Sequence, residues 1–99
     1  MIINNEQLRL IPPKLLFPHR IQMMQLLSSK ESVKFKQIRE ATVLSNGNLW
    51  SHMRALEADS LMAINKELNG RKVTTTYTIT EKGRQQFQDF RKTMTQLLA

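Results

Sequence analysis

Residues 35–80, FKQIREATVLSNGNLWSHMRALEADSLMAINKELNGRKVTTTYTIT, decide the fold of this chain. Near their start, apolar residues recur at the spacing of a helix that buries one face, and these are Phe35, Ile38 and Ala41. A second helical pattern begins near Ser45, whose hydroxyl can accept a hydrogen bond from the free N–H groups of a first turn. The polar run 46–48 adds turn character at this junction. We therefore expect two short helices separated by a tight turn.

Two β-rich segments follow the helix pair. Residues 61–67 and 73–80 are strand candidates, and the second segment consists almost wholly of β-branched and aromatic residues. Asn69-Gly70 lies between them and is typical of a hairpin turn. Asp59-Ser60 precedes them without the glycine that usually ends a helix in the left-handed conformation. Helix, turn, helix and hairpin in this order predict a winged helix-turn-helix, a fold that places its second helix in a DNA groove.

The N-terminal flank contains two further helical patterns. Residues 4–11 form a weak one that Pro12-Pro13 must end. Pro18 suits the first turn of a helix, because its missing N–H would be unpaired there. Residues 19–29 carry a core-facing apolar stripe, and 32–34 fit a very short strand.

The last helix is expected over 81–98, capped by Thr80. Its apolar stripe consists of Phe87, Phe90, Met94 and Leu97. This stripe, with Leu8 and Ile11, can form the interface with a second copy of the chain. It can equally close the core of a single copy.

The whole chain is expected to form one domain, because 99 residues are too few for two. Within 1–99, residues 18–80 form the helix-turn-helix and wing, while 1–17 and 81–99 are helical segments for dimerisation. The fold class is mainly α with a β-hairpin wing (α+β), a winged helix-turn-helix with about five helices and a two- to three-stranded sheet.

Positive charge is in clear excess. Fifteen Lys and Arg face eight Asp and Glu, giving a net charge of +7 and a pI near 10.3. Such a surplus favours a polyanionic partner, although a merely soluble basic protein can have the same composition.

Several classes of protein are disfavoured by what the sequence lacks. Without cysteine, disulfides and thiolate metal sites are excluded. His19 and His52 belong to different expected helices, so a two-histidine metal site is not expected. No signal peptide and no membrane-length apolar run occur, so we expect a cytoplasmic protein with no membrane partner. No glycine-rich phosphate loop or catalytic constellation is present, so we expect neither an enzyme nor a cofactor.

The second helix of the pair has two contrasting faces. Its inward seam consists of Leu49, Met53 and Leu56, which lie within a narrow arc at helical spacing. Its outward face is small or hydrogen-bonding near the start and nearly free of acid, which suits a major groove about 12 Å wide. His52 borders the seam and fits packing better than base contact. Trp50 can pack on a neighbouring element or lie on the nucleic-acid backbone.

Polar and basic side chains near this face match the chemistry of DNA. Asn46 and Asn48 can read adenine edges, Arg54 can reach guanine or a phosphate, and Ser51 can bond to either. The hairpin tip adds the cations Lys66, Arg71 and Lys72, while Lys36 adds charge on the first helix of the pair. An ordinary solvated helix face and a solvated basic turn would also account for these residues.

Together these motifs resemble the small winged-helix transcriptional regulators of the MarR/ArsR-like group, above all their compact stand-alone kind in bacteria and archaea. The likeness runs from Pro18 to the last helix and is densest in LSNGNL (44–49), GRK (70–72) and ITEKGR (79–84). The resemblance implies a homodimer whose terminal helices form the interface and whose helices and wings bind a pseudo-palindromic operator. It also implies that the DNA is approached by Ser45, Asn46, Asn48, Ser51, Arg54, Arg71 and Lys72.

Three positions depart from this group. Val43 and Ser60 stand where its members often have glycine, and Thr74 stands where the wing often has a further arginine. The last departure reduces the depth of minor-groove contact that the resemblance implies. The cysteines of the metal-sensing members are absent, so metal sensing is not implied.

The leading hypothesis is a sequence-specific, dimeric DNA-binding transcriptional regulator that acts by occupying an operator. Its candidate partners are double-stranded DNA, a second copy of the chain and a small-molecule effector. The alternative is a winged-helix protein–protein interaction module whose basic surface meets an acidic partner.

Overall fold

A computed structural model describes residues 5–42 and 44–99 of the chain. Its elements follow the order α1 (Asn5–Arg9), the 3-10 helix η1 (Pro13–Leu15), α2 (Pro18–Ser29), α3 (Phe35–Ala41), α4 (Asn46–Ala58), β1 (Met62–Asn69), β2 (Lys72–Ile79) and α5 (Glu81–Leu97). This order confirms the predicted winged helix-turn-helix. The turn position Val43 lies outside the described residues.

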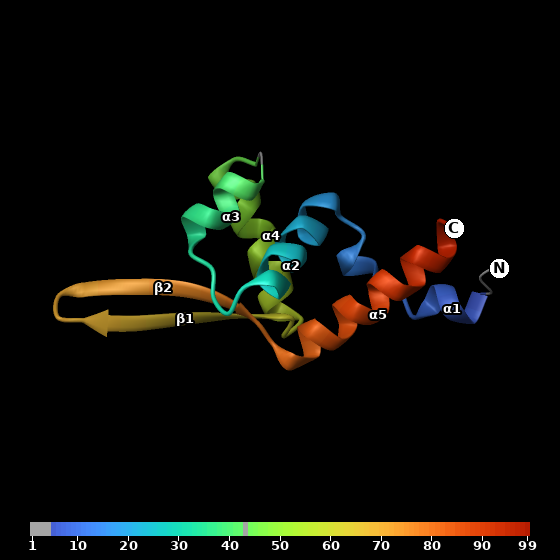
Figure 1. The fold of residues 1–99 in the computed structure, drawn as a ribbon. Coiled ribbons are helices and arrows are strands. Elements are labelled where there is room, and N and C mark those ends of the chain that lie inside the picture. Colours follow the sequence, from blue (N-terminus) through green and yellow to red (C-terminus); the bar gives the residue numbers. More distant parts are fainter. Residues whose placement is uncertain (1–4, 43) are drawn as a thin grey trace.

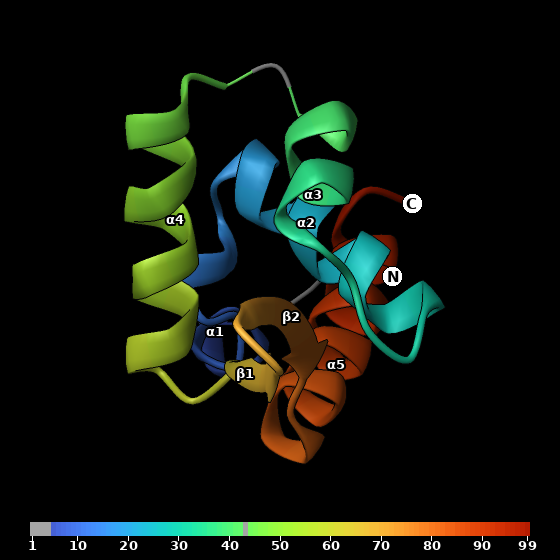
Figure 2. The same ribbon diagram turned by 90° about the vertical axis from the view of Figure 1, so that its left-hand side faces the viewer.

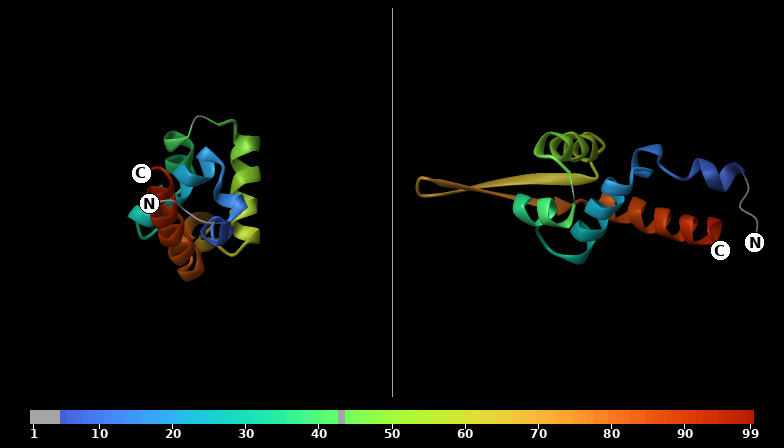
Figure 3. Two further views of the ribbon diagram at one scale, coloured as in Figure 1. Left: turned by 90° about the vertical axis from the view of Figure 1, so that its right-hand side faces the viewer. Right: turned by 90° about the horizontal axis from the view of Figure 1, so that it is seen from above.

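The molecule is elongated, with extents of 56 × 26 × 21 Å. Helices α2, α3 and α4 form a central body, from which the β1–β2 hairpin projects at one end (Figure 1). Helix α5 runs from the base of the hairpin in the opposite direction, and α1 lies beside its C-terminal half (Figures 1 and 3). The wing and the two terminal helices therefore occupy opposite ends of the molecule.

One core joins these elements. The α4 seam predicted from its spacing is fully buried, as are Met23, Met24 and Leu27 of α2 and Ile38 of α3. The prediction for Ala41 was wrong, because this residue is exposed. Helix α3 ends at Ala41, and the backbone of the next residue, Thr42, is extended. The Thr42 side chain is therefore the one that is buried. The Thr42 hydroxyl is satisfied there by donating to the Ile38 carbonyl oxygen at 3.0 Å.

The wing is a regular antiparallel hairpin in which Asn69 pairs with Lys72. The reversal is therefore at Gly70-Arg71, one residue later than Asn69-Gly70. Gly70 has a φ of 65°, as the first central position of a type II′ turn requires. The short strand expected at 32–34 is a single bridge, in which the backbone groups of Val33 and Tyr77 exchange hydrogen bonds of 2.9 and 2.7 Å.

Both predicted N-terminal caps are present. Ser45 Oγ accepts from the Asn48 N–H at 3.3 Å and so begins α4. Thr80 Oγ1 accepts from the Gly83 N–H at 2.9 Å and donates to the Ser60 carbonyl oxygen at 2.5 Å. The second cap thus joins the start of α5 to the end of α4.

Helix α4 ends in a left-handed turn made by serine. Ser60 has a φ of 60°, and the Leu61 N–H donates to the Leu56 carbonyl oxygen at 2.9 Å, while the Ser60 N–H donates to that of Glu57 at 2.8 Å. This pair of bonds is the Schellman arrangement that glycine usually completes. The fold therefore keeps the glycine geometry at this position without the glycine.

We expect Ser60→Gly to stabilise the protein by about 0.5–1 kcal/mol, because glycine adopts this backbone conformation without a Cβ penalty. The gain is limited by the greater freedom of glycine in the unfolded chain. Denaturant unfolding of both proteins measures the difference. A lower midpoint for the variant would contradict the expectation.

Candidate nucleic-acid interface

Helix α4 presents an exposed, hydrogen-bonding face to solvent. Its buried seam anchors it in the body, so its opposite side faces outward at one edge of the molecule (Figure 2). The predicted contact residues on and just before this helix are all exposed, and these are Ser45, Asn46, Asn48, Ser51 and Arg54. The face is therefore free to meet a partner.

A groove of about 870 Å³ separates α4 from the wing. Arg54 lines it from α4, while Lys66 and Thr75 line it from the two strands of the wing. None of the described acids forms an ion pair with Arg54 or Lys66. The groove thus brings two predicted DNA-binding cations together, with Glu57 as the acid in its lining.

The wing tip continues this positive surface. Lys66, Arg71 and Lys72 are all exposed around the turn. One acidic residue, Glu67, lies within residues 66–73, and the strand register places it opposite Thr74. Lys66, Arg71 and Lys72 form no ion pair with a described residue, so their charges remain available to a polyanion.

Lys36 differs from the other predicted cations. It lies on α3, where its Nζ atom is 3.9 Å from Glu40 Oε1, one helical turn along. Both side chains are strongly exposed, so this pair is weak. Lys36 nevertheless has a nearby carboxylate, whereas Arg54 and the wing cations form no ion pair with a described residue.

Trp50 packs within the chain and is also partly open. Its ring stacks on Phe35 of α3, with centroids 5.5 Å apart and an interplanar angle of 24°. It remains 41% exposed and lines the groove. Its packing role is therefore visible, while contact with DNA stays a prediction.

His52 is tied to α2, as expected of a packing histidine. Arg20 Nε donates to His52 Nδ1 at 2.9 Å, and the Arg20 guanidinium lies over the Phe17 ring at 4.1 Å from its centroid. This hydrogen bond requires a neutral imidazole with a free Nδ1 lone pair. Sequence reasoning missed Arg20, because the two residues are 32 positions apart.

Stability should therefore depend on the protonation of His52. Burial, and then the nearby Arg20 and His19, lower the pKa of His52 from its ordinary 6.5. The unfolded chain consequently takes up this proton at a higher pH than the folded one. The free energy of unfolding is thus fully retained above about pH 6.5 and falls as the pH drops through the folded pKa.

Urea unfolding at about pH 7.5 and 5.5 tests this dependence. We expect His52→Gln, which keeps an acceptor for Arg20, to lose less stability than the native chain over this range. Equal losses in both proteins would show that another group governs the pH response.

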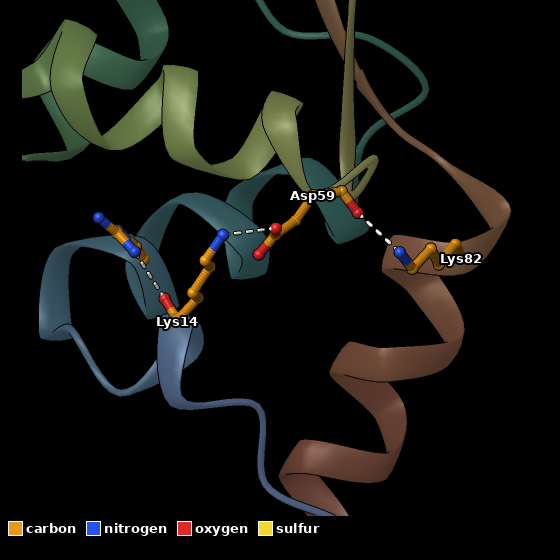
Figure 4. Close-up of polar contacts among 4 residues, drawn as sticks. Lys14, Asp59 and Lys82 are labelled. Carbon is orange, nitrogen blue, oxygen red and sulfur yellow. Dashed lines mark hydrogen bonds and ion pairs between the residues drawn. The ribbon is translucent and has the colours of Figure 1, made fainter.

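A polar junction fixes the C-terminal end of α4. The Asp59 side chain accepts a hydrogen bond from Lys14 Nζ at 2.7 Å through Oδ1. The backbone carbonyl oxygen of Asp59 accepts another from Lys82 Nζ at 2.9 Å (Figure 4). Arg20 Nη1 in turn donates to the Lys14 carbonyl oxygen at 3.0 Å. Helix α4 is thereby held to η1 and to α5, which orients its exposed face relative to the terminal helices.

The residues predicted for a dimer interface fall into two groups. Ile11, Phe87 and Phe90 are buried in the core of the chain itself. Leu8 and Leu97 are 42% and 41% exposed, and Met94 is partly buried. A dimer role for this stripe stays a prediction. Within it, Leu8, Leu97 and part of Met94 are the surface that is open to a partner.

Other kinds of site find no support in the described part of the chain. No group of three or more potential metal ligands occurs among residues 5–42 and 44–99. Over the same residues, no helix combines the length and apolar character needed to cross a bilayer.

Comparisons with known proteins agree with this geometry. A family model described as a winged helix DNA-binding domain matches residues 19–98. A search of curated sequences finds no significant match.

Solved structures of similar fold include proteins described as regulators of transcription. A transcriptional regulator homologue from Pyrococcus horikoshii OT3 is 28% identical, with a TM-score of 0.82 and 94% of each chain covered. A putative MarR-family regulator from Enterococcus faecalis V583 has a TM-score of 0.80 at 15% identity, covering 97% of this chain and 87% of that one. The repressor CouR, solved on a 23-mer DNA duplex, has a TM-score of 0.71 at 21% identity, covering 91% of this chain and 68% of its own. These likenesses confirm the predicted MarR-like fold.

Proposed function

Because the chain belongs to the winged helix DNA-binding domain family, we propose that it is a dimeric, sequence-specific regulator of transcription. It acts in the cytoplasm by occupying an operator and so blocking or redirecting polymerase. The observation that supports this most is the groove between α4 and the wing, which has Arg54 on one side and Lys66 on the other. A sugar–phosphate strand is the ligand that two such unpaired cations on facing walls would bind.

On this proposal α4 enters the major groove. Asn46 and Asn48 at its start read adenine edges, while Ser51 and Arg54 contact bases or phosphates further along. Ser45 lies at the helix start, where free N–H groups can also meet a phosphate. The protein groove between α4 and the wing then binds the adjacent DNA backbone, and the wing reaches the next minor groove of the DNA.

Dimerisation is proposed through the terminal helices. Leu8, Leu97 and Leu98 are exposed at the end of the molecule opposite the wing (Figure 1). Burial against a second copy would remove this apolar surface from water. The two α4 helices would then lie about 34 Å apart and read half-sites about 10 base pairs apart, centre to centre. A small-molecule effector stays a prediction.

Two measurements test the proposal. A gel shift on random duplex DNA at low salt should show binding, because the phosphate contacts are independent of sequence. No shift at high protein concentration would favour the alternative, a protein–protein module. Sedimentation at micromolar protein should show a dimer, and a monomer would remove the two-half-site arrangement.

A further inference from the structure

The wing ends in two large apolar side chains that the chain itself leaves uncovered. Leu68 and Val73 are 72% and 58% exposed. They are direct cross-strand partners, one pair before the Asn69–Lys72 pair that closes the turn. The hairpin carries them well away from the body (Figures 1 and 3). Their position is therefore open to a partner and far from the core.

These two side chains share a face with the groove. Side chains on a strand alternate between faces, so Leu68 shares its face with Lys66 and Ile64, while Val73 shares its face with Thr75 and Tyr77. Four residues of this face line the groove opposite α4, namely Ile64, Lys66, Thr75 and Tyr77. Leu68 and Val73 thus extend the wing side of the groove, which faces any partner bound against α4.

The charge around the pair identifies the chemistry of this partner. Lys66 precedes Leu68 on the same face, and Arg71 and Lys72 lie at the adjacent turn, all without ion pairs among the described residues. The neighbouring acid, Glu67, lies on the opposite face of the strand from Leu68. An apolar pair flanked by these three cations fits a narrow slot with anionic walls. The minor groove of duplex DNA has phosphate walls and an interior of sugars and base edges that accepts apolar side chains.

We infer that Leu68 and Val73 enter the minor groove beside the segment read by α4 and act as an apolar wedge. The inference rests on the proposed function. The Cβ atoms of a cross-strand pair are about 5 Å apart, and the minor groove is only about 6 Å wide, so the groove must open to admit both side chains. Opening is easiest at deformable steps such as TA, and the guanine 2-amino group obstructs the groove floor. The wing therefore selects A·T-rich flanks outside the bases that α4 contacts.

Selection of bound sequences from a random duplex library tests this with the full chain. The native protein should enrich A·T pairs and TA steps outside the α4 site. Leu68→Thr/Val73→Thr places β-branched residues, which favour strands, at both positions but removes the apolar tip. We expect it to select the same central sequence without the flank preference, and to bind the native consensus about tenfold more weakly. Leu68→Ile/Val73→Ile should retain both properties.

A second measurement uses the native protein alone and so does not depend on the folding of a variant. Inosine·cytosine pairs lack the guanine amino group and present an A·T-like minor groove. Flanks of inosine·cytosine should bind like A·T flanks, whereas G·C flanks should bind about tenfold more weakly.

Four results would overturn the inference. Equal affinity for inosine·cytosine and G·C flanks would do so while leaving DNA binding intact. An unchanged flank preference in the threonine variant, or loss of its dimer in sedimentation, would assign the pair to the hairpin or to a subunit contact. Failure of the native protein to shift any duplex would overturn the proposed function and the inference together.

Discussion

Gly83→Ala should destabilise the protein by about 2–3 kcal/mol, although alanine is the better helix former by about 1 kcal/mol. A Cβ at position 83 would lie 2.1 Å from the Leu61 carbonyl oxygen and 2.9 Å from its carbonyl carbon. This backbone cannot move aside easily, because the Leu61 N–H is bonded to Leu56 and its carbonyl oxygen accepts from the Thr80 N–H at 3.2 Å. The collision therefore outweighs the gain in helix propensity.

Thermal unfolding measures this effect. At about 4–8 °C per kcal/mol for a domain of this size, the midpoint should fall by roughly 10–20 °C. Gly47→Ala is the matched control, since a Cβ at that position on α4 meets nothing within 4 Å. Its midpoint should stay unchanged or rise slightly. Equal behaviour of the two variants would mean that α5 does not lie this close to Leu61.

The contact at Gly83 also bears on function. It lets the first turn of α5 rest on the backbone at the junction between α4 and the wing. The Thr80 cap and Lys82, which donates to the Asp59 carbonyl oxygen, join the same elements. Helix α4, the wing and α5 are thus fixed to one another at a single place. On the proposed function, a substitution there should disturb the spacing of the proposed DNA contacts as well as stability.

Local patterns in the sequence were sufficient to predict the elements of the fold. The seam of Leu49, Met53 and Leu56 was predicted because burial of one helix face imposes that spacing. The caps at Ser45 and Thr80 were predicted because a hydroxyl before a helix satisfies its first N–H groups. Each of these features depends on residues within a few positions of one another.

Features that depend on distant residues could not be predicted. The Lys14–Asp59 pair joins residues 45 positions apart, and no local pattern indicates that they meet. The left-handed conformation of Ser60 is local, but it was missed for another reason, since serine does not favour it and no residue type marks it. The stripe on α5 was visible as apolar, but spacing alone could not show that Phe87 and Phe90 would be 2% and 3% exposed in the chain's own core.

The second large effect is expected at the wing tip. Arg71→Ala/Lys72→Ala should weaken binding to every duplex about tenfold or more at low salt, because both cations are free to contact phosphates. Each lost phosphate contact also reduces counterion release. The slope of log K against log salt should therefore become shallower by about two for each bound subunit. Anisotropy titrations of a labelled duplex at several salt concentrations measure both quantities.

Arg91→Ala/Lys92→Ala is the matched control, since it removes the same two residue types from α5, near the end of the molecule opposite the wing (Figure 1). Because α5 belongs to the proposed dimer interface, sedimentation must show that this variant has the same oligomeric state as the native chain. It lowers the net charge equally, so any general loss of attraction appears in both variants. Only the wing variant should lose slope, because a phosphate contact releases counterions only where it forms. Equal slopes for the two variants would place the wing tip away from the backbone. A shallower slope with unchanged flank preference would instead separate the phosphate contacts of Arg71 and Lys72 from the wedge proposed for Leu68 and Val73.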